Sequence, residues 1–251
     1  MSGHSKWSQI KRQKGVTDAK RGQVFTKLAK IITVAAKQGG GDPVMNPSLR
    51  VAIEQARAEN LPKDNIDRAI KRGTGELGGA AIEELRYEVY GPGGVAIVID
   101  AATDNPNRST AEVKTTLNKH GGKLATAGAV AFQFAHRGVL TVPKQDQPID
   151  PGNLELEIMD VCPEAYEELS DAFVIYVEPD ALQTAQKVLK QKSIKFTEAI
   201  LAWEPIQTIA LTDPNLAKQT LRLIEALEDL DDVTSVTANF DMPDELLSSI
   251  S

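Results

Sequence analysis

The chain has 251 residues, of which 41% are hydrophobic, and its formal net charge is -7. This length and apolar content suffice for one to three compact domains, whereas no stretch approaches the ~20 apolar residues that cross a bilayer. The single cysteine, Cys162, excludes an intrachain disulfide and favours a reducing compartment. Because no apolar segment follows the lysines at the start of the chain, we expect no secretory signal and a cytoplasmic protein.

The charge is distributed unevenly along the chain. Residues 1–72 hold 15 Lys and Arg against 6 Asp and Glu, and the remaining residues hold 13 against 29. This asymmetry predicts a basic nucleic-acid-binding module joined to acidic domains. Charged residues on ordinary solvated helix faces are the alternative explanation.

The basic part begins with an arm, Met1 to Val16, that lacks hydrophobic periodicity. Three amphipathic helices should follow, because apolar residues recur at helical spacing after Asp18, after Asn46-Pro47 and after Pro62. Glycines end the first and third of these helices. We therefore predict an N-terminal three-helix bundle.

Cations on this bundle would bind phosphates without regard to sequence, and an aromatic or imidazole ring on the arm could stack on bases. The predicted nucleic-acid-binding residues are His4, Lys6, Trp7, Lys11, Arg12, Lys14, Lys20, Arg21, Lys27, Lys30, Lys71 and Arg72. Burial of Trp7 against its own bundle is an equally common use of such a residue. Arg50, Arg57, Lys63 and Arg68 add to the basic surface, although local pairing of Lys63 and Lys71 with Asp67 would neutralise part of it.

Gly73 to Gly79 contain the spacing GxGxxG, but the segment follows a helix rather than a strand. It is therefore interpreted as a linker and not as a dinucleotide-binding loop. Beyond it, apolar residues alternate as in strands. Strands are expected over residues 85–90, 95–99, 130–134, 138–142, 166–169, 173–177, 194–201, 203–211 and 233–240. Helices are expected over residues 107–119, 154–161, 182–189 and 215–227.

These elements predict two ferredoxin-like α+β domains, one inserted in the other, in a multi-domain α and β chain. Residues 1–80 would form the basic helical domain, residues 81–135 plus 203–241 a split domain, residues 136–202 the inserted domain, and residues 242–251 a tail.

The sequence carries little sign of catalysis. The three histidines are dispersed, Cys162 precedes a proline, and the acidic run from Glu225 to Asp232 lacks the spacing of a calcium loop. We expect no metal, no cofactor, no small-molecule substrate and no enzymatic activity. A strand-to-helix loop with Asn105, Asn107 and Arg108 could bind an anion, but a plain helix-capping turn explains these residues equally well.

Several long motifs resemble one known family. They are GHSKWSQIKRQKGVTDAKRGQVFTKLAKIITVAAKQGGGDP, NLPKDNIDRAIKRGTGEL, YEVYGPGGVAIVID, TDNPNRSTAEV and NKHGGKL. They look like the YebC/PmpR family of bacterial proteins, whose mitochondrial relatives activate translation of a cytochrome oxidase subunit. After Leu124 the chain reads ATAGAVAFQF and departs from the family's usual run.

The resemblance implies a helical N-terminal domain followed by two α/β domains, and two competing functions. The first is a transcriptional regulator that binds DNA. The alternative is a ribosome-associated translation factor that binds ribosomal RNA and relieves stalling at proline-rich sequences. The resemblance adds no catalytic residue, and we expect a monomer without a membrane partner.

Overall fold

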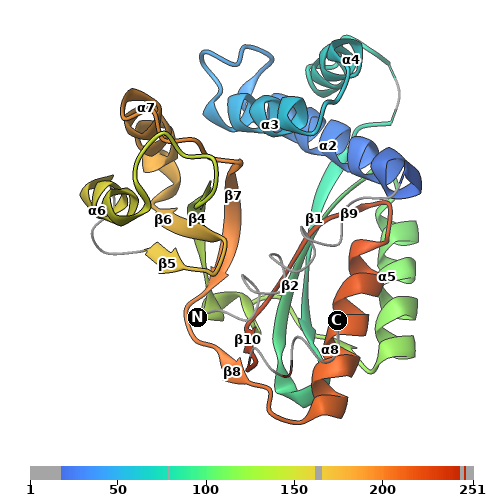
Figure 1. Ribbon diagram of the computed structural model, residues 1–251. Helices are drawn as coiled ribbons and strands as arrows, with labels where there is room; N and C mark the ends of the chain where they lie inside the picture. The colour runs from blue at the N-terminus through green and yellow to red at the C-terminus, as the bar shows by residue number, and fades with distance from the viewer. Residues whose placement is uncertain (1–17, 79, 162–165, 244–245, 247–251) are drawn as a thin grey trace.

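The computed structural model describes residues 18–78, 80–161, 166–243 and 246 (Figure 1). The predicted arm with His4, Lys6, Trp7, Lys11, Arg12 and Lys14 lies outside these residues, as do Cys162 and most of the tail.

Helices α2 (Asp18–Gly39), α3 (Pro47–Ala58) and α4 (Lys63–Gly73) share one apolar core. Asn46 joins the first two helices, because its side chain accepts a hydrogen bond from the Leu49 amide and donates to the carbonyls of Ala35 and Gly40. Gly73 lets α4 approach α2 closely, since a Cβ there would lie 2.4 Å from the Thr33 carbonyl oxygen. The helices expected from periodicity are therefore present and pack together.

The first sheet contains β1 (Glu83–Tyr90), β2 (Ala96–Thr103), β3 (Lys123–Leu124) and β9 (Val233–Ala238), in the order β3-β1-β2-β9 with antiparallel neighbours. Helices α5 (Pro106–His120) and α8 (Pro214–Glu228) cover one face of it (Figure 1). The central strand β2 is an almost continuous apolar run because both of its faces are buried.

The second sheet contains β4 (Phe134–Pro143), β5 (Tyr166–Glu168), β6 (Ala172–Val177) and β7 (Glu198–Pro205), in the order β5-β6-β4-β7. Helices α6 (Pro151–Val161) and α7 (Leu182–Gln191) pack on one face, so the chain order is β-α-β-β-α-β. This chain order and strand order are those of a ferredoxin-like fold.

Other assignments were wrong. The first sheet is not ferredoxin-like, because the turn at Gly91 to Gly94 joins β1 directly to β2 as a hairpin. The strand that returns after α5 is β3, whereas residues 131–133 form a 3-10 turn. Glu88 causes that turn, since its carboxylate accepts hydrogen bonds from the amides of Gly128, Val130 and Ala131 and keeps them out of a sheet.

The expected strand over residues 203–211 is also divided. Trp203 pairs with His136 in the second sheet, in which β4 and β7 pair from Phe134 with Pro205 to Thr141 with Glu198. Strand β8 (Ile209–Ala210) instead pairs in parallel with β10 (Phe240–Asp241). Three residues, Ile206, Gln207 and Thr208, separate the two strands, so the expected single strand serves two sheets.

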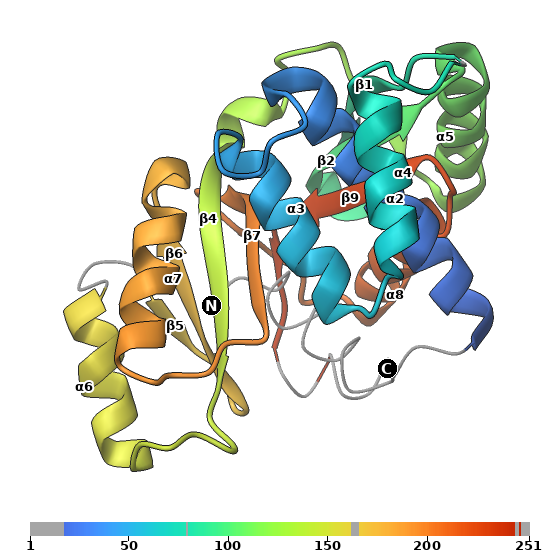
Figure 2. The same cartoon turned by 90° about the horizontal axis from the view of Figure 1, so that it is seen from above.

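The helices and both sheets contact one another. Seen from above, α3 lies beside β7 while α2 and α4 lie over the end of the first sheet that holds β9 (Figure 2). Val51 of α3 enters the core of the second sheet, and Val34 of α2 is buried with Ile82 and Ala102. In the described part of the chain, no helix is long and apolar enough to cross a membrane.

Candidate nucleic-acid interface

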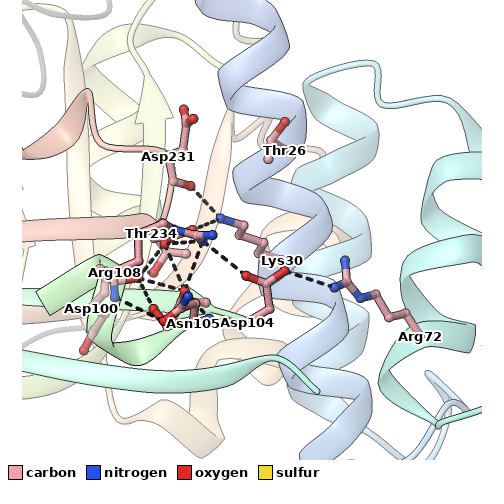
Figure 3. Close-up of polar contacts among 12 residues, drawn as sticks. Thr26, Lys30, Arg72, Asp100, Asp104, Asn105, Arg108, Asp231 and Thr234 are labelled. Atoms are coloured by element: carbon pink, nitrogen blue, oxygen red, sulfur yellow. Dashed lines mark hydrogen bonds and ion pairs between the residues drawn. The ribbon is translucent and has the colours of Figure 1, made fainter. Parts of the chain in front are cut away.

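Lysines predicted to bind nucleic acid on α2 face the turn between α8 and β9. The Lys27 ammonium donates to the Glu228 carbonyl oxygen, and Lys30 Nζ lies 2.8 Å from the Asp231 carbonyl oxygen and 2.5 Å from Asp232 Oδ1. The Lys30 side chain is only 16% exposed. Both lysines therefore hold α2 against the first sheet, and Figure 3 shows the contact of Lys30.

Asp232 is the centre of this contact, which we term the Asp232 clamp. Its second oxygen, Oδ2, lies 2.9 Å from the Arg108 guanidinium, 2.9 Å from Thr103 Oγ1 and 2.5 Å from Ser109 Oγ. Burial alone would raise the pKa of Asp232, but hydrogen bonds from Lys30, Ser109, Arg108 and Thr103 outweigh burial and hold the pKa well below its ordinary value. The Asp232 clamp is therefore an ionised, fully hydrogen-bonded carboxylate that joins α2, α5 and β2.

The loop before α5 belongs to the same cluster. The Asn105 side chain accepts a hydrogen bond of 3.2 Å from the Arg108 amide and caps the helix, while Asn107 is exposed. Arg108 is paired with Asp104 at 3.2 Å as well as with Asp232. Capping of α5 thus accounts for Asn105. The Arg108 guanidinium, which a bound anion would need as its partner, is already paired with the carboxylates of Asp104 and Asp232.

The structure separates the remaining predicted residues by exposure. Arg21, Lys71 and Arg72 are exposed, and only the backbone of Lys20 is described. Arg72 lies 3.7 Å from Asp104, at the edge of the Asp232 clamp. The structure therefore brings Lys27, Lys30, Arg72 and Arg108 together, and it leaves Lys71 on the outer surface of α4.

Two further cations complete this outer surface. Lys63 and Arg68 are exposed, as is Arg57 on α3, and within the described residues the expected ion pairs of Lys63 and Lys71 with Asp67 are not formed. Arg68 and Arg72 are four residues apart and project from the same side of α4. We term the exposed cations Lys63, Arg68, Lys71 and Arg72 of α4 the α4 basic surface. Helical spacing alone was sufficient to find it.

A groove of about 310 Å³ runs between α2 and α4, beside the Asp232 clamp. Its walls carry Lys30, Arg68 and Arg72 together with the polar side chains of Thr26 and Asn65. None of the described residues that line it is acidic. The groove therefore concentrates positive charge.

A larger cleft of about 550 Å³ lies where the helices and the two sheets meet. Asp100 in this cleft accepts hydrogen bonds from Arg86 Nε at 2.8 Å and Trp203 Nε1 at 3.0 Å. The Arg86 guanidinium lies 4.3 Å from the centre of the Trp203 ring, and the His136 ring lies 5.1 Å from it. The pKa of His136 is lowered, first by burial and then by Arg86, although Asp100 opposes the shift. These groups satisfy one another and tie the two sheets together.

Groups of three or more His, Cys, Asp or Glu side chains that could hold a metal ion are not found among the described residues. The fold and the site together define an α/β protein in which a basic helical unit is held against the first sheet by buried charge and against the second sheet by apolar packing.

Comparison with known proteins identifies this protein more closely. The chain belongs to the TACO1/YebC family, because the model of the TACO1/YebC N-terminal domain matches residues 5–76 and that of the second and third domain matches residues 82–240. These matches confirm the resemblance seen in the sequence motifs.

Curated relatives span the whole chain. A protein of Halothermothrix orenii is 46% identical over all of this chain and 99% of its own length, and one of Dictyoglomus turgidum is 45% identical over the full length of both. Both bear the name probable transcriptional regulatory protein. The crystal structure of a conserved hypothetical protein from Aquifex aeolicus matches with a TM-score of 0.85 and 41% identity, over 92% of this chain and 94% of that one.

Proposed function

We propose that the protein is a non-enzymatic regulator of gene expression that binds DNA through its basic helical unit. The observation that carries this proposal is the α4 basic surface, whose cations face solvent on a chain that is acidic overall. The name probable transcriptional regulatory protein, given to relatives of the same length, supports the regulatory role.

The chemistry of this surface favours the phosphate backbone over base edges. Lysine and arginine side chains neutralise phosphates and release counterions, whereas sequence reading needs a helix or ribbon fitted into a groove. Helix α4 has only 11 residues, and its end at Gly73 packs closely against Thr33 and Ala36 of α2. We therefore expect low base specificity and strong salt dependence.

Binding to duplex DNA at increasing salt concentration tests this proposal. The double variant Lys71→Glu, Arg72→Glu should weaken DNA binding by ~10-fold or more at low salt. The slope of the logarithm of affinity against the logarithm of salt concentration should fall by about the amount that two phosphate contacts contribute. An exposed change of equal charge on helix α5, Lys114→Glu with Lys119→Glu, is the control. Wild-type affinity that is insensitive to salt would contradict phosphate binding.

The alternative of a ribosome-associated translation factor predicts a preference for RNA. Competition between duplex DNA and ribosomal RNA for the same protein decides between the two partners. A strong preference for the RNA would replace the DNA proposal.

We also propose that residues 134–205 form a unit inserted in the first α/β unit, which adjusts the boundaries expected from sequence. The pairing of β9 with β2 across this segment supports the division, as does the closed pairing of β4 to β7. Limited proteolysis of the full chain should cut first beside Gly78 and Ala80, which are exposed between α4 and β1.

A further inference from the structure

We propose that the groove between α2 and α4 is a binding site for a phosphate group, with Arg68 and Arg72 as its main ligands. The inference rests on the proposed function and narrows it, because it assigns the phosphate contact to one cavity rather than to the basic surface as a whole. It also names Arg68, Asn65 and Thr26 as site residues.

The groove has a fixed floor. Thr33 on α2 donates a hydrogen bond of 3.1 Å to the Ala69 carbonyl oxygen on α4, and it is buried. The absence of a side chain at Gly73 allows the two helices to meet just beyond this point. Ile82, at the start of the first sheet, closes one end. Because the helices are locked to each other, the groove keeps its shape without a ligand.

Cations at the mouth of the groove are available. Arg68 is exposed, and within the described residues its guanidinium has neither a hydrogen bond nor an ion pair. Arg72, one turn later, has only the 3.7 Å contact with Asp104, in which both side chains are more than 40% exposed. A guanidinium pair presents parallel N–H donors that match the oxygens of a phosphate.

The opposite wall, formed by α2, is fixed in place. Lys30 lines this wall, but its ammonium points to Asp231 and Asp232, so its position is fixed and its charge is paired (Figure 3). The side-chain amide of Asn65, which has no hydrogen-bond partner in the described part of the chain, adds a neutral donor, whereas the Thr26 hydroxyl lines the groove but donates to the Gly22 carbonyl oxygen at 3.0 Å. With Lys30 paired, Arg68 and Arg72 supply the positive charge of the groove, and no carboxylate is among the described residues that line it, which favours a phosphate over a neutral or cationic ligand.

The phosphate could belong to a nucleic-acid backbone or to a free anion, and both would meet the same donors. The volume of about 310 Å³ leaves room for a sugar beside the phosphate, which favours a polymer that enters at the exposed arginines. Because Arg72 also contacts Asp104, a bound phosphate would draw Arg72 away from the Asp232 clamp.

The test compares two single variants of the full-length chain that remove one positive charge each from α4. Arg68→Gln removes a groove ligand, whereas Lys63→Gln removes an exposed cation that does not line the groove. Binding of a labelled DNA duplex and a labelled single-stranded RNA is measured over a range of salt concentrations, and inorganic phosphate and pyrophosphate are titrated in parallel. Thermal unfolding confirms that both variants are folded.

Arg68→Gln should weaken nucleic-acid binding by ~10-fold, with Arg68→Lys recovering part of the loss, and Lys63→Gln should weaken it by no more than about twofold. Equal effects of the two variants would overturn the groove while leaving the proposed function intact. Phosphate or pyrophosphate binding that is lost only in Arg68→Gln, with no nucleic-acid binding by the wild type, would support the groove and overturn the proposed function. Absence of binding to every probe would overturn both.

Discussion

Individual carboxylates in this protein have opposite electrostatic environments. Asp232 is surrounded by donors and stays ionised, whereas the pKa of Glu204 on β7 is raised to about 8, first by burial and then by the nearby Glu167. A carboxyl with a raised pKa stabilises the fold only while it is protonated. Near neutral pH, Glu204 is therefore mostly protonated in the folded protein, whereas the same carboxyl is ionised in the unfolded chain.

Replacement of Glu204 tests this effect. The free energy of unfolding should fall as the pH rises from the ordinary value of 4.5 to about 8, because the unfolded chain loses its proton first. Glu204→Gln removes the titration, so it should raise the Tm by a few degrees above about pH 8 and leave it nearly unchanged below pH 4.5. The exposed Glu112→Gln on α5 serves as the control. An equal Tm gain for Glu204→Gln at both ends of the pH range would contradict the titration.

At the scale of elements, the contact between α2 and α4 depends on one glycine. A Cβ at Gly73 would lie 2.4 Å from the Thr33 carbonyl oxygen and 2.7 Å from the Ala36 Cβ. Gly22, in α2, has open space around its Cβ position. Replacement of glycine by alanine should therefore lower the free energy of unfolding at Gly73 and raise it at Gly22.

Gly73→Ala should lower the free energy of unfolding by about 2 kcal/mol, because α4 must move away from α2. Gly22→Ala should raise it by about 0.5–1 kcal/mol through helix propensity. Thermal unfolding of both variants gives the comparison. A neutral Gly73→Ala would show that the two helices separate without cost.

At the scale of the whole molecule, the Asp232 clamp sets how the basic helices sit on the first sheet. Asp232→Asn removes the charge that balances Lys30 and Arg108, and it should lower the free energy of unfolding by about 3 kcal/mol, or the Tm by ~5–10 °C. Asp231→Asn should change it by less than about 0.5 kcal/mol, because Asp231 is exposed and contributes only its backbone carbonyl to Lys30.

The difference in stability between the wild type and Asp232→Asn should depend on pH in a definite direction. The folded-state pKa of Asp232 lies below its ordinary value of 3.8, so its contribution is complete above that pH and is lost as the pH falls further. The wild type and Asp232→Asn should therefore converge in Tm in acid. A difference in Tm between the two proteins that persists in acid would mean that the charge of Asp232 is not what stabilises the contact.

Local sequence determined much of this protein. The helices of the basic unit, the caps at Asn46 and Asn105, and the α4 basic surface follow from spacing and side-chain chemistry within a few residues. The family could be recognised from motifs in the same way. The 3-10 turn at residues 131–133 could not be foreseen, because Glu88, more than forty residues earlier, holds its amides.

Only the tertiary structure decided which charges are available. Lys27 and Lys30 resemble Lys71 in the sequence, yet the first two contact the turn that contains Asp231 and Asp232, about two hundred residues away. The division of residues 203–211 between two sheets likewise depends on partners distant in the chain. The physical reason is the same in each case: a buried ion pair or a strand pairing depends on groups that folding brings together, and local sequence does not encode their distance.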